Sequence, residues 1–201
     1  TMRAANEARL CKVAAPVERL WTAPVSPLLV HVVVLLLLVV VVRALVGSGV
    51  AMPWKVGPLW LVALTGAVAA GKAAGGVLAD RLGMRTVGVG ALCLSAPLLA
   101  MAPDWAIAGV AGMLLFNMTM PVTLVAIAGE MPERPGFAAG WTALALIAGT
   151  LAGMGSAAAG LTSVATVVWV IGSAVVLWLG LSRVRPGFAA SANPVPRRKE
   201  A

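Results

Sequence analysis

Among the polar side chains within the long apolar stretches of this sequence, four are the candidates for binding a polar solute. Lys72 lies in one such stretch, and Asn117, Thr119 and Thr123 lie in another. An ammonium group attracts anions, while amide and hydroxyl groups both donate and accept hydrogen bonds. We predict that these four residues line a substrate path.

Each of these residues also has a purely structural interpretation. Lys72 could extend its ammonium group to the inner lipid headgroups. Pro121 has no amide hydrogen and its ring clashes with the carbonyl of Asn117, so a kink is predicted there. Asn117, Thr119 and Thr123 could then serve only to bond the backbone groups that the kink frees. The sequence leaves both interpretations open.

The sequence shows no residue set typical of catalysis or metal binding. It has no phosphate-binding loop, and Cys11 and Cys93 lack metal-ligand spacing, so we predict free thiols. The one candidate nucleophile and base for an intramembrane hydrolase, Ser156 and His31, lie on unrelated stretches. All seven acidic residues lie outside the apolar stretches. We therefore predict no enzymatic activity, no cofactor and no metal.

The composition is that of a membrane protein. Of the 201 residues, 61% are hydrophobic and only 11% are charged, whereas a soluble domain has about 25% charged residues. The formal net charge is +8. These charges lie mainly in loops and tails, which favours anionic lipid headgroups over nucleic acid as the partner. We expect a lipid bilayer as partner and no nucleic acid.

Apolar runs of about the length that crosses 30 Å of hydrocarbon as a helix divide the chain. They cover residues 27–46, 58–79, 86–102, 105–128, 137–160 and 163–182. Single strands cannot cross lipid, so the predicted fold is all-α, with six transmembrane helices over residues 27–182. Residues 1–26 are predicted to be an amphipathic cytoplasmic lead-in on the membrane surface, and residues 183–201 a disordered cytoplasmic tail.

Positive charge is concentrated on one side of these runs. Of the 15 Lys and Arg residues, only Lys55 lies in a loop on the other side, and Arg43 and Lys72 lie within runs. Cytoplasmic loops are enriched in Lys and Arg, so both termini are predicted to be cytoplasmic. Arg43 lies near the outer end of the first run and is predicted to reach the outer headgroups.

The loop between the second and third runs carries a recognisable motif, Gly-Gly-Val-Leu-Ala-Asp-Arg-Leu-Gly-Met-Arg at residues 75–85. It resembles the loop signature of the major facilitator superfamily of transporters, G-x-L-a-D-R-x-G-R-R. Met84 departs from the pattern, since the family more often has Arg or Lys there. The positions that match are Gly76, Leu78, Ala79, Asp80, Arg81, Gly83 and Arg85.

The resemblance implies one six-helix half of such a transporter, with a 3+3 inverted repeat. The fourth run contains no arginine and the lead-in is long and charged, which favours the C-terminal half. The implied function is secondary transport of a small organic solute by alternating access, with export expected, in a plasma or bacterial inner membrane. A second six-helix half, in the same chain or another subunit, is the implied partner. A non-transporting assembly subunit is the alternative.

The resemblance also assigns roles within the loop. Gly76, Asp80, Arg81, Gly83 and Arg85 would form a conformational latch on the cytoplasmic face. Gly76 would let helices approach, and Gly83 would make the turn. Asp80 would meet an arginine, or the N–H groups at the start of the fifth run, in one transport state.

Two pairs of glycines are spaced by four residues within apolar runs. Gly71 and Gly75 lie in the second run, and Gly149 and Gly153 lie in the fifth. Residues four apart lie on the same face of a helix, and small residues there allow close helix approach in membranes. We predict helix packing, and not substrate binding, for these four glycines.

Overall fold

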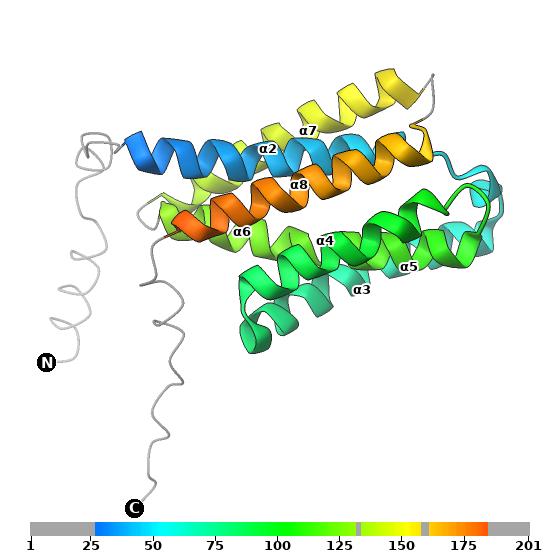
Figure 1. The fold of residues 1–201 in the computed structure, drawn as a ribbon, viewed down its shortest axis with the longest axis horizontal. Coiled ribbons are helices and arrows are strands. Elements are labelled where there is room, and N and C mark those ends of the chain that lie inside the picture. Colours follow the sequence, from blue (N-terminus) through cyan, green and yellow to red (C-terminus); the bar gives the residue numbers. More distant parts are fainter. Residues whose placement is uncertain (1–26, 132–133, 158–160, 185–201) are drawn as a thin grey trace, which may run out of the picture.

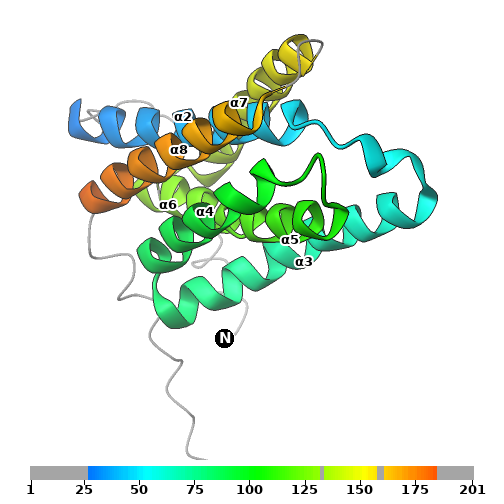
Figure 2. The ribbon, with the colours of Figure 1, turned by 45° about the vertical axis from the view of Figure 1, so that its right-hand side comes forward.

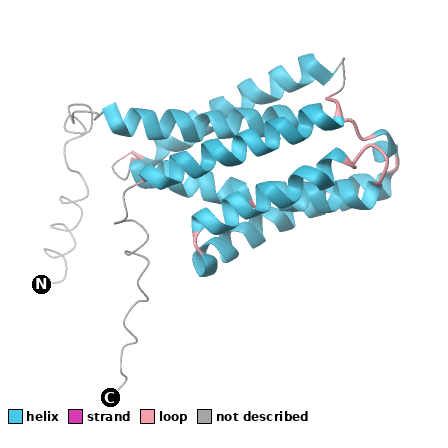
Figure 3. Cartoon of the chain, in the orientation of Figure 1, coloured by secondary structure: helices cyan, strands magenta, loops and turns pink. Residues whose placement is uncertain are grey.

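The computed structural model describes residues 27–131, 134–157 and 161–184. The predicted lead-in and nearly all of the predicted tail lie outside these residues. Within them the regular structure is helical (Figure 3), apart from one isolated bridge between Val50 and Leu161.

The helices follow the predicted runs closely but not everywhere. The first two are longer than their runs, and the predicted fourth run is divided between two helices. Their bounds are α2 Pro27–Gly49, η2 Pro53–Val56, α3 Pro58–Leu82, α4 Met84–Ala100, α5 Ala106–Asn117, α6 Thr119–Glu130, α7 Pro135–Ala157 and α8 Ser163–Arg183 (Figure 1).

Among the described residues, five helical segments are long and apolar enough to cross a membrane. They are α2, α3, α5 together with α6, α7 and α8. The predicted all-α fold with membrane-spanning helices is confirmed, with five candidate spans among the described residues. The remaining apolar helix, α4, has 17 residues, about 25 Å at 1.5 Å per residue, which is shorter than the typical hydrocarbon core.

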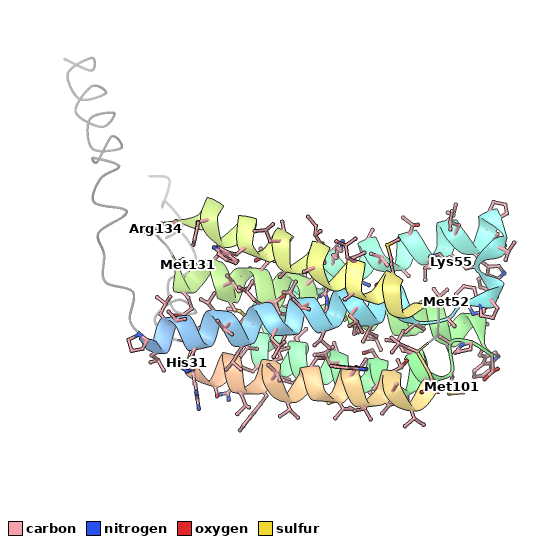
Figure 4. All side chains as sticks on the ribbon, turned by 90° about the horizontal axis from the view of Figure 1, so that it is seen from above. His31, Met52, Lys55, Met101, Met131 and Arg134 are labelled. Carbon is pink, nitrogen blue, oxygen red and sulfur yellow. The ribbon has the colours of Figure 1, made fainter. Side chains whose placement is uncertain are left out.

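The helices run side by side in alternating directions, so their ends form two opposite faces. His31, Met131 and Arg134 lie at one face, and Met52 and Lys55 lie at the other (Figure 4). The predicted cytoplasmic loop charge Arg134 and the predicted outer loop charge Lys55 are therefore on opposite faces of the bundle.

The core lies between α2 and α8 and the helices packed against them. Its fully buried side chains include Leu36 of α2, Leu92 of α4, Ile127 of α6 and Leu177 of α8. The helices α3 and α7 lie on opposite flanks of the bundle (Figure 2). Valine-rich α2 is helical despite its β-branched residues, because a helix bonds its own backbone where lipid offers no partner.

On one flank, the glycine pair of α3 lies directly against the backbone of the α5–α6 segment. A Cβ atom at Gly71 would meet the carbonyl oxygen of Leu114, and one at Gly75 would lie 2.6 Å from the Cα of Met118. Real side chains do not fit at such separations. Glycine at these two positions is what allows α3 to lie so close to its neighbour.

On the other flank, the glycine pair of α7 lies against α2 in the same way. A Cβ atom at Gly149 would meet the carbonyl oxygen of Val41, and one at Gly153 would lie 3.0 Å from the Cα of Leu45. Both flanking helices are thus held by contacts between backbones.

The turn between α3 and α4 is made by Gly83, as predicted. Its φ of 89° is rarely adopted by residues with a side chain. Gly76, to which the sequence assigned a close helix approach, has more room. A Cβ atom there would lie 4.0 Å from the Cβ of Pro121, which is an ordinary contact, so the close approach belongs to Gly75 instead.

Replacing Gly75 with alanine should destabilise the bundle, because the new methyl group clashes with the backbone of Met118. We expect a net loss of about 1 to 3 kcal/mol, although helix propensity alone favours alanine by up to about 1 kcal/mol. Thermal unfolding of the purified protein in detergent micelles measures the difference. Gly66→Ala in the same helix is the control, since a Cβ atom at Gly66 would meet nothing within 4 Å. Equal melting temperatures for the two variants would contradict the clash.

Candidate functional site

The break between α5 and α6 is the centre of the candidate site. α5 ends at Asn117 and α6 begins at Thr119, with Met118 between them. Pro121 lies in the first turn of α6, where its missing N–H would have no helical partner in any case. The predicted interruption of the fourth run is therefore present, three residues before the proline.

The polar side chains at the break bond to backbone carbonyls of their own segment. Asn117 Nδ2 donates to Met113 O at 2.8 Å, and Thr119 Oγ1 donates to Phe116 O at 2.8 Å. Thr123 Oγ1 donates to Thr119 O at 3.2 Å. All three side chains are buried. These bonds match the structural interpretation of the three residues, yet each hydroxyl oxygen can still accept a bond.

Arg43 of α2 reaches this break, which the sequence analysis did not foresee. Its Nη1 donates to Thr119 Oγ1 at 3.0 Å. Its Cζ lies 5.8 Å from the centre of the Phe116 ring, within the range of a cation–π interaction. Only 7% of the Arg43 surface is exposed. The prediction that Arg43 extends to the outer headgroups is wrong.

The direction of the Cα–Cβ bond explains this error. In an α-helix that bond tilts towards the N-terminus, so a side chain projects back along its own helix. The nearer end of α2 is its C-terminus, about 9 Å beyond Arg43 at 1.5 Å per residue. The side chain therefore projects towards the middle of α2, away from the nearer membrane surface.

A periodicity argument would not have found Arg43 either. Leu36, Val39 and Val40, which precede it by seven, four and three residues, are buried with it on one face of α2. Leu38 on another face is exposed, but it is equally apolar. Because both faces of α2 are apolar, its pattern does not indicate which one packs inwards.

Lys72 is not brought to this site. It is exposed on α3, whereas its neighbour Gly71 faces α5, with its Cβ position 3.2 Å from the Cβ of Asn117. Consecutive residues are about 100° apart around a helix. Of the four residues predicted to line a substrate path, the structure groups Asn117, Thr119 and Thr123 and leaves Lys72 outside.

The latch residues lie at the turn between α3 and α4. Asp80, Arg81 and Arg85 are exposed there. The Cζ of Arg85 lies 5.8 Å from the centre of the Trp178 ring, which joins this turn to α8. Within residues 27–131, 134–157 and 161–184, Asp80 forms no ion pair or side-chain hydrogen bond. Its predicted contact with the start of the fifth run is not made here and stays a prediction.

The opposite face is tied together by a tryptophan. Trp54 Nε1, in the short helix η2, donates to Ala102 O at 2.6 Å. Its ring packs edge-on against Trp60, with ring centres 5.4 Å apart. The loop after α2 is thereby joined to the turn between α4 and α5.

The geometry does not favour a hydrolytic site. Ser156 lies in the last turn of α7, close to the end of α2 that Gly153 contacts. His31 lies in the first turn of α2, where its Nδ1 is 2.9 Å from Pro27 O. The two residues are therefore at opposite ends of the bundle. In the part of the chain that the structure describes, no three His, Cys, Asp or Glu residues are grouped to hold a metal ion.

Comparisons of the chain with protein-family models, with curated proteins and with solved structures gave no match. The likeness of residues 75–85 to a transporter signature is therefore a resemblance of one motif. The function of the chain is inferred from that motif together with the geometry of the bundle.

Removing the hydroxyl group of Thr119 should destabilise the fold, because Arg43 Nη1 then loses its acceptor. We expect Thr119→Val to cost about 1 to 2 kcal/mol, since bonds to charged donors exceed the membrane average of about 0.6 kcal/mol. Thr119→Ser keeps the hydroxyl and should cost less. Unfolding by denaturing detergent in mixed micelles measures both free energies.

Thr65→Val is the matched control for this experiment. Its hydroxyl group bonds only to Leu61 O, on the exposed side of α3, so its loss should change the free energy of unfolding little. A Thr119→Val variant as stable as Thr65→Val would show that the bond to Arg43 contributes nothing.

Proposed function

We propose that this chain is one six-helix half of a facilitator-type secondary transporter, which moves a small organic solute by alternating access. The observation that carries the proposal is a correspondence between its first three and last three helical segments. In this scheme α2 corresponds to α5–α6, α3 to α7, and α4 to α8. Such inverted repeats are typical of secondary transporters, whose substrate sites lie where the repeats meet.

The main packing partners correspond under this exchange, whereas the smaller contacts of α3 with α4 and of α6 with α7 have no counterpart of similar extent. α3 packs against α5–α6, as α7 packs against α2. α4 packs against α5–α6, as α8 packs against α2. α4 and α8, which exchange with each other, are also in contact. The first helical segments of the two triplets run in opposite directions, as an inverted repeat requires.

The glycine contacts correspond in detail. In each triplet the second helix carries two glycines four residues apart. The pair in α3 meets Leu114 and Met118 of the α5–α6 segment, and the pair in α7 meets Val41 and Leu45 of α2. The two positions met are four residues apart in both cases. Arg43 lies midway between Val41 and Leu45, and Phe116 lies midway between Leu114 and Met118. Arg43 and Phe116 are thus equivalent positions, and they face each other across 5.8 Å. This supports a 3+3 inverted repeat.

The turn at residues 75–85 supports the family assignment. It combines the transporter-like motif with a glycine at positive φ and with exposed charges at Asp80, Arg81 and Arg85. Exposed charges at a helix end can bind a second body in one transport state and release it in the other. We infer that this second body is another six-helix half, in the same chain or in a separate subunit.

Charge distribution gives the proposed orientation and location. Both termini would be cytoplasmic, because Lys and Arg are concentrated at that face and Lys55 lies at the opposite one. We assign the chain to a plasma or bacterial inner membrane, as the C-terminal half of an exporter.

Cysteine labelling tests the topology. In a background of Cys11→Ser and Cys93→Ser, Lys55→Cys in η2 and Arg81→Cys in the last turn of α3 each place one thiol at an exposed position. An impermeant maleimide added to intact cells should label only the first variant, and both should react after permeabilisation. Labelling of both in intact cells would rule out the proposed arrangement.

Flux through proteoliposomes tests transport itself. The chain, and a tandem fusion of two copies, should release preloaded benzoate faster than protein-free liposomes do. Asp80→Asn should slow release about ten-fold, since contacts at a helix end are worth about 1 to 2 kcal/mol. Asp104→Asn is the control, because Asp104 is exposed at the other face of the bundle. Specific binding of a probe without release would favour the assembly-subunit alternative.

A further inference from the structure

We propose that Arg43 binds the anionic group of a small solute, a carboxylate or a phosphate, beside Thr119 at the break between α5 and α6. As a statement about the transported solute, this rests on the proposed function. As a statement about binding, it rests on the geometry of Arg43 alone.

The charge of Arg43 has no counter-charge in the described part of the chain. Asp80 and Asp104 are exposed near opposite ends of the bundle. Glu130 ends α6, eleven residues beyond Thr119, which is about 16 Å along the helix. None of these three carboxylates pairs with Arg43. A charged residue in a membrane interior faces a partner or a water-filled cavity, and Arg43 has only a hydroxyl group and an aromatic ring.

The guanidinium group retains hydrogen-bonding capacity. It carries five N–H donors in one plane, and its one hydrogen bond within the described residues is from Nη1 to Thr119. That planar arrangement fits a carboxylate or a phosphate through two parallel bonds. A cationic ligand would be repelled, and a neutral one would leave the charge uncompensated.

Arg43 also lies where a transporter of this design would bind its solute. It belongs to α2 and Thr119 to α6, which are the first segments of the two proposed repeats. The ring of Phe116 lies beside the guanidinium group and offers an apolar surface to the organic part of a solute. The side chain is 7% exposed, so the group is enclosed but not sealed.

Thermal stability with defined anions tests the binding. The purified chain in micelles should unfold at a higher temperature with benzoate or inorganic phosphate than with benzamide, at equal ionic strength. Arg43→Gln should abolish the shift. Arg43→Lys keeps the charge but loses the planar donor set, so at least ten-fold more anion should be needed. Lys55→Gln, at an exposed position of η2, should behave as the wild type.

Chemical rescue tests the same proposal if the Arg43 variants fold poorly. Arg43→Cys, in the background lacking Cys11 and Cys93, is treated with aminoethyl methanethiosulfonate, which restores a cation, or with methyl methanethiosulfonate, which does not. The anion-dependent shift should return only with the cationic reagent. Rescue by both reagents would show that bulk, and not charge, matters at this position.

Several results would overturn the proposal. A wild type insensitive to both anions would do so, and so would an Arg43→Gln variant that responds as the wild type does. A further contradicting result concerns the tandem fusion. If anions no longer raise its unfolding temperature, and Arg43→Gln destabilises it, then a carboxylate of the second half is the partner of Arg43. Anion binding that needs Arg43 without any flux would overturn transport and leave this inference intact. Flux that does not need Arg43 would leave transport intact and overturn the inference that Arg43 binds the transported solute.

Discussion

Close contact between helix backbones is the constraint on which the rest of this structure depends. Lipid supplies no hydrophobic force to bring helices together, so they associate by packing and by the few polar bonds they share. Four glycines bring α3 against α5–α6 and α7 against α2. These contacts fix both flanks relative to the central helices: α3 against the α5–α6 segment, and α7 against α2. The bond from Arg43 to Thr119 adds a polar contact between the two central segments themselves.

The sequence predicted the helices well because each must bond its own backbone in lipid, so an apolar run of sufficient length has one available structure. It predicted their ends less well. α3, for example, continues through Asp80 and Arg81 to Leu82. Hydropathy indicates only where lipid ends, and a helix can extend beyond that point into water. The break near Pro121 was predictable, since proline removes a backbone donor. The turn at Gly83 was expected from the resemblance of the loop to the transporter signature, and its positive φ agrees with that role.

The candidate site was only partly predictable, for a physical reason. Asn117, Thr119 and Thr123 stand out as polar residues in an apolar run, but their partners depend on which faces of two helices meet. In α2 every face is apolar, so nothing in its pattern indicates that Arg43 lies on the buried side. The Cβ direction would have argued against a reach to the outer surface. The partner of Asp80 is a further case, because an exposed charge does not by itself specify what it binds.

The helix break explains why a buried arginine is tolerated here and why its charge is not neutralised. Arg43 donates to the Thr119 hydroxyl group, which in turn donates to the Phe116 carbonyl in the last turn of α5. Such a chain of bonds is mutually polarising. The end of α5 carries a partial negative charge, which favours a cation, but the start of α6 beside it carries a partial positive charge. The two helix ends largely offset each other, so the break supplies oriented hydrogen-bond partners without a full counter-charge. In the described part of the chain no carboxylate lies beside Arg43, and the anionic solute proposed above would supply the balancing negative charge.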